Sequence, residues 1–141
     1  MKALLRIALT IALVNSVPAF AQTPNTQAPD TDVASPALQK EFEAFIAKFR
    51  AALKANDASA IAEMTKFPFG ADPSVDAAQF RAKTYRSIFN AKIRTCIQRG
   101  KGIYSRDDYK NESYFIFCDD DIFVFTKTPA GFLFTEVSVN D

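Results

Sequence analysis

Carboxylates and tyrosines are the side chains of this chain that best suit acid–base chemistry. The acids cluster at residues 107–108 and 119–121. Paired carboxylates serve as general acid and base when they face a common pocket. However, residues 119–121 fall at a predicted turn, where solvated acids are ordinary, and they lack the Asp-x-Asp-x-Asp-Gly spacing of an EF-hand calcium loop. We therefore expect a solvated turn there, with a calcium site or a catalytic cluster as the alternatives.

The chain contains no histidine. This removes the commonest nitrogen ligand of zinc sites and the usual base of serine and cysteine triads. Only four glycines are present, and no glycine-rich phosphate-binding motif occurs among them. The sequence thus predicts no metal, no cofactor and no catalytic residue that can be named, which disfavours an enzyme.

The two cysteines, Cys96 and Cys118, are predicted to form a disulfide if the chain reaches an oxidising compartment. The bond would close a loop of about 23 residues, worth roughly 3 kcal/mol in the chain-entropy model. Two buried free thiols or a reactive thiol are the alternatives. A reactive thiol is disfavoured because no histidine can act as its base.

The N-terminus has the three parts of a secretory signal. Lys2 and Arg6 precede an apolar run over residues 7–14, and small side chains at Ala19 and Ala21 follow. We expect residues 1–21 to be removed and the mature protein to be periplasmic or secreted. A membrane anchor is the alternative, although the run is short for about 30 Å of hydrocarbon.

Cleavage would leave a nearly neutral protein. It removes two basic residues and no acidic one, so that 17 basic and 16 acidic residues become 15 and 16. This balance predicts no binding to nucleic acid and none to a membrane after signal cleavage. The middle of the chain is nevertheless basic, and we expect a solvated face there that balances the acidic C-terminal half. The alternative is an anionic ligand or partner, if Arg86, Lys92 and Arg94 share a face.

Three helical segments are predicted after a flexible tether at residues 22–34. Ser35 and Pro36 suit the start of the first helix, and Asp57 suits the N-cap of a second that continues to Lys66. A third begins near residue 74 or 76 and extends toward residue 100, with residues 91–106 left open between helix and strand. The first helix has its apolar residues on one face, at Leu38, Phe42, Phe45, Ile46, Phe49 and Leu53.

Three strands are predicted at residues 114–118, 122–127 and 132–139, because these runs are aromatic and β-branched and are joined by short polar turns. An earlier strand is expected over residues 102–106. Helices followed by an antiparallel meander indicate a single α+β domain over residues 35–141, with the N-terminal helices packed on a curved antiparallel sheet.

This order of elements resembles the NTF2-like (cystatin-like fold) superfamily. The resemblance covers about residues 35–139 and rests on two N-terminal helices, the Phe67-Pro68-Phe69 turn, a third helix with Phe80 and Tyr85, and the final sheet. It implies a cone-shaped apolar pocket between helices and sheet, and a homodimer formed through the sheet. Members include isomerases, dehydratases, transport adaptors and binding domains, so the fold does not choose the function.

Aromatic residues are the candidate ligand contacts: Phe67, Phe69, Tyr85, Tyr104 and Tyr109. Core packing is the competing interpretation for both phenylalanines, for Tyr85 and for Tyr114. A polar stretch at residues 105–113 suits a recognition loop. Tyr104 directly precedes this stretch, and Tyr109 lies within it.

We expect a small non-enzymatic binding or interaction domain for an apolar ligand or an exported protein. One alternative is a small NTF2-like enzyme that uses a Tyr/Asp acid–base pair, as isomerases of that superfamily do. The other is an inhibitor or immunity-type protein that binds another exported protein.

Overall fold

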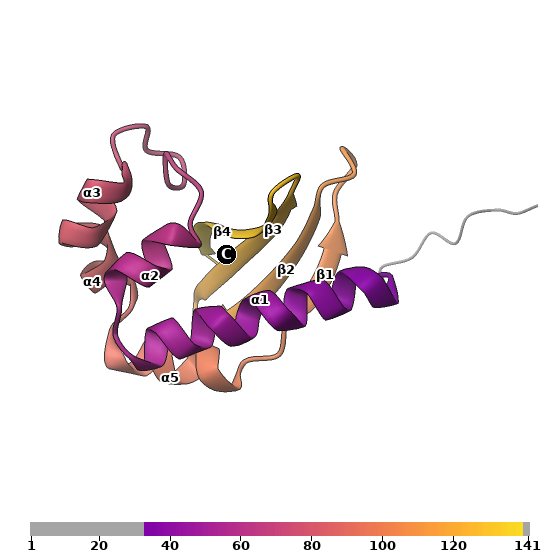
Figure 1. Cartoon of the computed structure of the whole chain (residues 1–141), viewed down its shortest axis with the longest axis horizontal. Coiled ribbons are helices and arrows are strands. Elements are labelled where there is room, and N and C mark those ends of the chain that lie inside the picture. Colours follow the sequence, from indigo (N-terminus) through magenta and orange to yellow (C-terminus); the bar gives the residue numbers. More distant parts are fainter. Residues whose placement is uncertain (1–32, 140–141) are drawn as a thin grey trace, which may run out of the picture.

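The structure, a computed structural model, describes residues 33–139. The predicted signal peptide and all of the predicted tether except Val33 and Ala34 lie outside the described residues. Helices cover one face of a four-stranded sheet (Figure 1), which confirms the predicted α+β class. In chain order the elements are α1 (Pro36–Lys54), α2 (Ala58–Glu63), α3 (Ala77–Gln79), a π-helical turn (Phe80–Thr84), α4 (Tyr85–Ile88), α5 (Ala91–Arg99), β1 (Ile103–Arg106), β2 (Glu112–Cys118), β3 (Asp121–Thr128) and β4 (Gly131–Val139).

Helix α1 starts where the sequence predicts. The Ser35 hydroxyl accepts a hydrogen bond from the backbone N–H of Leu38 at 3.2 Å, and Pro36 occupies the first helical position. The apolar face of α1 packs on the sheet and buries a single stripe, made of Leu38, Phe42, Ile46, Phe49, Ala52 and Leu53.

Helix α2 is shorter than predicted, because the chain after it joins the sheet. Asp57 caps the helix as expected, accepting from the backbone N–H groups of Ser59 and Ala60. The helix ends at Glu63 instead of Lys66. Hydrogen bonds with Phe134 of β4 replace the helical ones: Phe134 N–H donates to the Met64 carbonyl at 2.8 Å, and Lys66 N–H donates to the Phe134 carbonyl at 2.9 Å.

The third predicted helix is divided. Asp76 caps its first turn, the chain passes through the π-helical turn, and α4 ends at Ile88. Asn90 then begins a new helix in an extended conformation (ψ 170°), its side-chain oxygen accepting from the Ile93 N–H at 3.0 Å. Residues 91–99 are therefore helix and residues 103–106 are strand, which settles the alternatives left open by the sequence.

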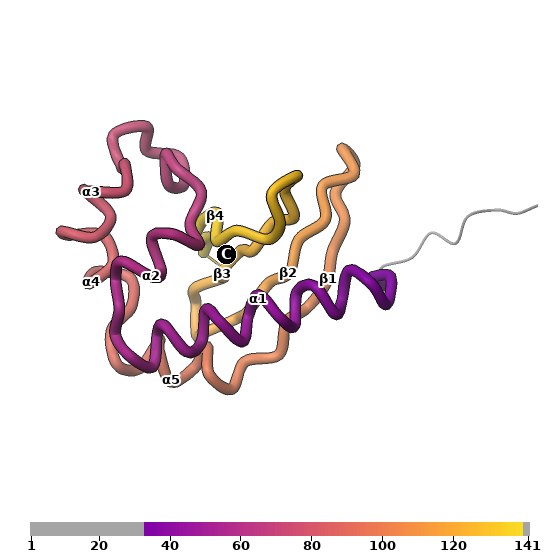
Figure 2. Tube along the Cα trace, viewed as in Figure 1, coloured from indigo at the N-terminus to yellow at the C-terminus, as the bar shows by residue number. Residues whose placement is uncertain are grey.

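The sheet is an antiparallel meander in the order β1-β2-β3-β4, and its two outward-projecting hairpins are visible in the trace (Figure 2). The predicted strand at residues 102–106 is confirmed as β1. Side chains alternate between the two faces of the sheet, so that Tyr114 and Phe125 pair on the helix side while Ser113 and Thr126 pair on the other. A bulge between Val124 and Phe125 adjusts the register with β4.

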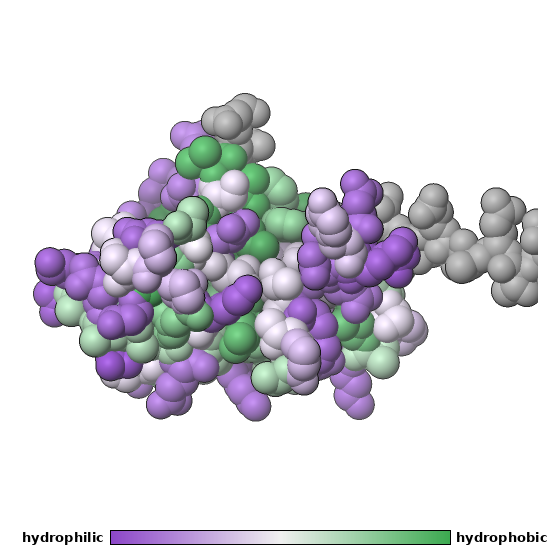
Figure 3. All heavy atoms as spheres, turned by 90° about the horizontal axis from the view of Figure 1, so that it is seen from above, coloured by the Kyte–Doolittle hydropathy of each residue, from purple (hydrophilic) through white to green (hydrophobic). Residues whose placement is uncertain are grey.

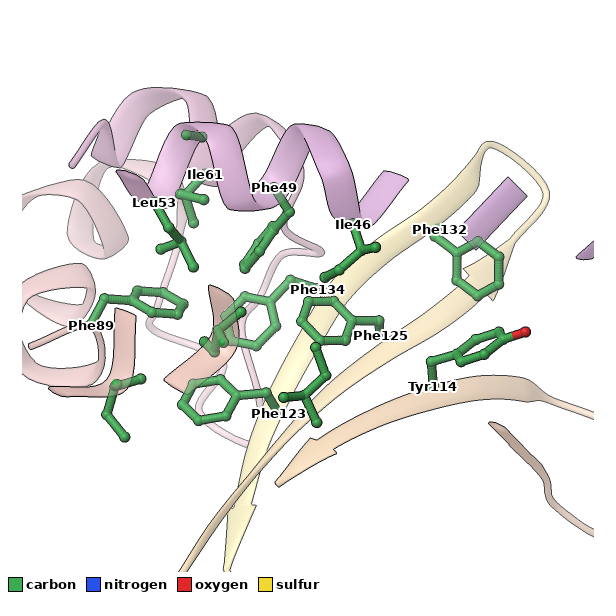
Figure 4. Packing of buried hydrophobic residues seen from close by; sticks show 14 of the residues in the cluster. Ile46, Phe49, Leu53, Ile61, Phe89, Tyr114, Phe123, Phe125, Phe132 and Phe134 are labelled. Atoms are coloured by element: carbon green, nitrogen blue, oxygen red, sulfur yellow. The ribbon is translucent and has the colours of Figure 1, made fainter. Parts of the chain in front are cut away.

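Aromatic rings fill the space between α1 and the sheet (Figure 4). Phe49 lies edge-on to Phe125, with centroids 5.1 Å apart and planes at 82°, and Phe89 and Phe134 pack beside them. These four side chains are at most 1% exposed. Tilted and edge contacts are the arrangements that aromatic quadrupoles favour.

A disulfide joins α5 to the end of β2. Cys96 and Cys118 are bonded, with their Cα atoms 5.9 Å apart, as the sequence predicts. Within residues 33–139, no helix is long and apolar enough to cross a membrane. The surface seen from above carries hydrophilic side chains throughout, with hydrophobic areas between them (Figure 3).

Candidate ligand-binding groove

A groove of about 660 Å³ lies between α1 and the segment that leads into β1. Three stretches far apart in the sequence form it: the N-terminal part of the described chain, residues 100–104, and Tyr114 of β2. The lining residues are Val33, Ala34, Gln39, Phe42, Glu43, Ile46, Arg50, Gly100, Lys101, Gly102, Ile103, Tyr104 and Tyr114.

Arg50 fixes one wall of this groove to α1. Its Nε donates to the Ile97 carbonyl at 2.9 Å, and its Nη2 donates to the Gly100 carbonyl at 2.5 Å. In return, the Gln98 side-chain amide donates to the Arg50 carbonyl at 2.8 Å. Because charged donors satisfy the exposed carbonyls at the end of α5, the link to β1 is held in one position.

Gly102 allows the chain to pass close to the floor of the groove. A Cβ atom at this position would lie 2.6 Å from Cε1 of Phe42 and 3.2 Å from Cδ1 of Tyr114. Any larger residue would therefore push against both rings. Gly100 is similarly confined, since its Cβ would collide with Ile116.

Stacked aromatic rings form the floor. Phe42 and Tyr114 lie face to face, with centroids 3.8 Å apart and planes at 1°. Tyr104 is the cross-strand partner of Tyr114, and their ring centroids are 5.6 Å apart. The Tyr104 hydroxyl donates to Glu112 Oε1 at 3.1 Å. Residues from a helix and two strands thus build one aromatic surface.

The Tyr114 hydroxyl is buried and has no hydrogen-bond partner among the described residues. Figure 4 shows the oxygen turned away from Phe125 and the other core rings. Burial raises the pKa of the Tyr114 phenol, and Tyr104, Glu43 and Glu112 add to the rise. The phenol is therefore a protonated donor at neutral pH. Leaving such a group unpaired costs about 1–3 kcal/mol.

The polar groups of the groove lie around this aromatic floor. Gln39 donates its side-chain N–H to Glu43 Oε1 at 3.0 Å, and Lys101 is exposed on the opposite side. The groove thus combines an apolar surface with one buried donor and charges of both signs. Chemically, such an arrangement can hold the apolar part of a small molecule and orient its polar part.

A second hollow, of about 390 Å³, lies on the sheet face opposite the helices. Its centre is a row of hydroxyls on three strands: Ser113 donates to Thr126 at 3.1 Å, and Thr126 and Thr135 are 3.1 Å apart. These hydroxyls satisfy one another, so this hollow offers less to a ligand than the first groove does.

The five predicted contact residues do not come together. Phe69 is buried against Phe80 and Phe134, and Phe67 packs on Phe80. Tyr85 is buried at the far end of the helical layer, where its hydroxyl donates to Asn56 Oδ1 at 2.9 Å.

Of the remaining two, only Tyr104 lines the groove. Tyr109 stands at the tip of the β1–β2 hairpin with 88% of its surface exposed. Asp107 orders this turn by accepting from the backbone and side-chain N–H groups of Asn111, both at 2.8 Å.

The sequence does not predict Phe42 or Gly102 as part of a site, and it favours core packing for Tyr114. The pairing of Tyr104 with Tyr114 would have been found by folding residues 103–106 back on 112–115 as a hairpin. The stack of Phe42 on Tyr114 has no local signal, because 71 intervening residues separate its two rings.

No group of three or more acidic or cysteine side chains within residues 33–139 is placed to hold a metal ion. Asp119 of the predicted acidic turn instead forms an exposed ion pair with Lys92 at 2.7 Å. The fold and groove define a small α+β domain with one aromatic-floored hollow beside its helical layer. No family model, curated protein or solved structure matches this chain.

Proposed function

We propose that this protein is a non-enzymatic binding domain that holds a small amphipathic molecule in the groove beside Phe42 and Tyr114. The unpartnered phenol of Tyr114 carries the proposal. A buried donor without an acceptor is costly in the free protein, and a ligand that supplies an acceptor recovers that cost on binding. The groove volume also falls within the usual range of about 300–1,000 Å³ for ligand sites.

The expected ligand has an apolar body and one hydrogen-bond acceptor. The body would lie over Phe42 and Ile46 and against Ile103, which is 51% exposed. The acceptor would pair with Tyr114. A carboxylate suits this place, because Lys101 lies at the rim.

The same proposal places the protein outside the cytoplasm and within an NTF2-like superfamily. The N-terminal sequence pattern supports export, and the Cys96–Cys118 bond is consistent with it. Helices on one face of a curved meander support the resemblance. Native mass spectrometry of the periplasmic or secreted protein would test cleavage after Ala21, the homodimer that the resemblance implies, and any retained ligand.

An NMR titration with octanoate tests the groove itself. We expect shifts centred on Phe42, Gly102 and Tyr114, and about tenfold weaker binding in Tyr114→Phe because one hydrogen bond is lost. Tyr109→Ala is the matched aromatic control and should bind as the wild type does. Shifts spread over the whole surface, or equal affinity in Tyr114→Phe, would contradict the proposal.

Recognition of another exported protein is the second candidate, favoured by the exposed Tyr109 on its ordered turn. An aromatic anchor on a rigid loop is a common binding hot spot. The test compares partners retained by the wild type and by Tyr109→Ala from periplasmic extract. A partner retained equally by both proteins would argue against this loop.

A small enzyme is the remaining alternative, and the observation for it is the Tyr104–Glu112 hydrogen bond beside the groove. The observed pair is a tyrosine and a glutamate, whereas the pair expected from the sequence is a tyrosine and an aspartate. Turnover of small ester, lactone or steroid-like substrates that is lost in Tyr104→Phe would support it.

A further inference from the structure

A separate pocket of about 340 Å³ lies at the end of the molecule where α2, α4 and α5 meet. Figure 1 shows these helices at the opposite end from the hairpin tips. Arginine, asparagine and aromatic side chains line it: Asn56, Ala58, Arg81, Tyr85, Arg86, Phe89, Asn90 and Arg94. No carboxylate is among them.

Three guanidinium groups border this pocket without acidic partners. Arg81, Arg86 and Arg94 form no ion pair among the described residues. Lys92, grouped with Arg86 and Arg94 in the sequence, instead pairs with Asp119 in the turn between β2 and β3. The predicted basic face is therefore divided, and its arginines gather around the pocket while its lysine does not.

Arg94 is held in place at the pocket wall. Its Nη1 donates to the Phe89 carbonyl at 2.8 Å, which uses one of its five N–H donors. Arg94 is half-buried, whereas Arg81 and Arg86 are exposed. One anchored and two exposed guanidinium groups thus border the same space.

Both asparagines use their oxygens elsewhere. Asn56 Oδ1 accepts from the Tyr85 hydroxyl at 2.9 Å, and Asn90 Oδ1 accepts from the Ile93 N–H at 3.0 Å. Their amide nitrogens, which are donors, make no hydrogen bond among the described residues. The lining therefore offers many donors and few acceptors, which suits a ligand rich in acceptor oxygens.

Asp57 is an acid whose charge acts on Tyr85 in the pocket wall. Burial raises the pKa of Tyr85, while the positive charge of Arg94 opposes the rise and the negative charge of Asp57 adds to it. The Asp57 carboxylate is engaged in capping α2. The lining itself carries three arginines and no acid, which leaves an excess of positive charge at the pocket wall.

We propose that the pocket between Arg81, Arg86 and Arg94 binds the phosphate group of a phosphate monoester. Guanidinium groups present paired donors that match phosphate oxygens, and a dianion matches the excess charge better than a carboxylate does. The volume exceeds that of phosphate alone, so the pocket also has room for part of the carbon skeleton of the ester. This site is independent of the groove beside Tyr114.

Titration of the ¹⁵N-labelled protein with phenyl phosphate, at ionic strength held constant with NaCl, tests the proposal. We expect saturable shifts within residues 56–58 and 81–94, and about tenfold weaker binding in Arg86→Gln and in Arg81→Gln. Lys83→Gln is the matched control, because it removes one positive charge from the same helical segment without lining the pocket. Its affinity should stay within twofold of the wild type.

Two further probes identify the source of the phosphate. Inorganic phosphate should compete with phenyl phosphate, whereas acetate at the same concentration should not. Sedimentation with phosphatidic acid vesicles, compared with phosphatidylcholine vesicles, distinguishes a lipid headgroup from a free ester; specific binding to either source supports the site. Absence of saturable shifts, identical shifts with chloride alone, or equal weakening by Lys83→Gln would overturn the proposal.

Discussion

The two ends of the aromatic core use the same kind of side chain with different results. At one end Phe49 meets Phe89, Phe125 and Phe134 at tilted or edge-on angles, and all four rings are buried and purely apolar. At the other end Phe42 lies flat on Tyr114, a groove adjoins the stack, and a buried hydroxyl lacks a partner. Burial is similar at both ends, so burial alone does not mark a binding site. What distinguishes the second end is an unpaired polar atom beside accessible space.

Phe134→Ala should have the largest effect. Its ring contacts Phe49, Phe69 and Phe89, and its removal leaves a cavity that rigid neighbours cannot fill. We expect a loss of about 3–5 kcal/mol in the free energy of unfolding, measured in urea. Phe42→Ala should cost less, because the groove already borders its ring. Equal losses would show that the two ends are packed alike.

Removal of the disulfide comes next. The Cys96→Ser/Cys118→Ser double variant should lose about 3 kcal/mol in the free energy of unfolding, since the bond closes a loop with a sequence separation of 22. The bond also anchors α5, which leads into the groove wall. We therefore expect octanoate binding to weaken as well. Unchanged binding would mean that Arg50 alone holds the wall.

How well the sequence predicts each end of the core depends on how far apart in the chain its contacting residues lie. The caps at Ser35 and Asp57, the face of α1 and the strand order arise from local patterns, and the structure confirms them. The early end of α2 was missed, because it depends on hydrogen bonds to Phe134, about 70 residues away. The local sequence there favours a helix, but the chain pairs with β4 instead.

The candidate groove was predicted only through Tyr104. Its floor and walls come from α1, the 100–104 segment and β2, and no short-range pattern links Phe42 to Tyr114. The disulfide was predicted correctly because a single pair of cysteines leaves one pairing. Residue type thus predicted the disulfide, where only one pairing is possible. It did not predict the groove, which depends on packing between distant segments.

Removing the hydroxyl of Tyr114 and adding one at Phe125 tests the comparison of the two ends more closely. Tyr114→Phe should raise the free energy of unfolding by about 1 kcal/mol, because it removes a buried unpaired donor. Phe125→Tyr, at the cross-strand partner position, should lower it by about 1–3 kcal/mol by burying a new hydroxyl. Chemical unfolding measures both. If Tyr114→Phe is destabilising, the hydroxyl is not a cost in the folded protein.

High pH should produce the smallest effect. Burial raises the pKa of Tyr85 and Tyr114 in the folded protein, so the folded state binds these protons more tightly than the unfolded state does. Stability should stay constant between pH 7 and 9 on this account, and fall as pH rises above the ordinary tyrosine value of about 10. Tyr114→Phe should make this decrease in stability with pH shallower. Unfolding at each pH can be followed by the absorbance of tyrosinate. An unchanged slope would assign the effect to Tyr85.

The hydrogen bonds between the segment after α2 and β4 have a consequence for solubility. An uncovered outer strand presents free N–H and C=O groups that can recruit a second chain into intermolecular β-structure. Here Met64 and Lys66 already occupy the groups of Phe134, and Gly70 N–H bonds to the Thr135 carbonyl at 3.3 Å. The opposite border, β1, is only four residues long and ends in Arg106. The β4 border is thus covered at Phe134 and Thr135, and the β1 border offers only four residues and a charged end for such pairing.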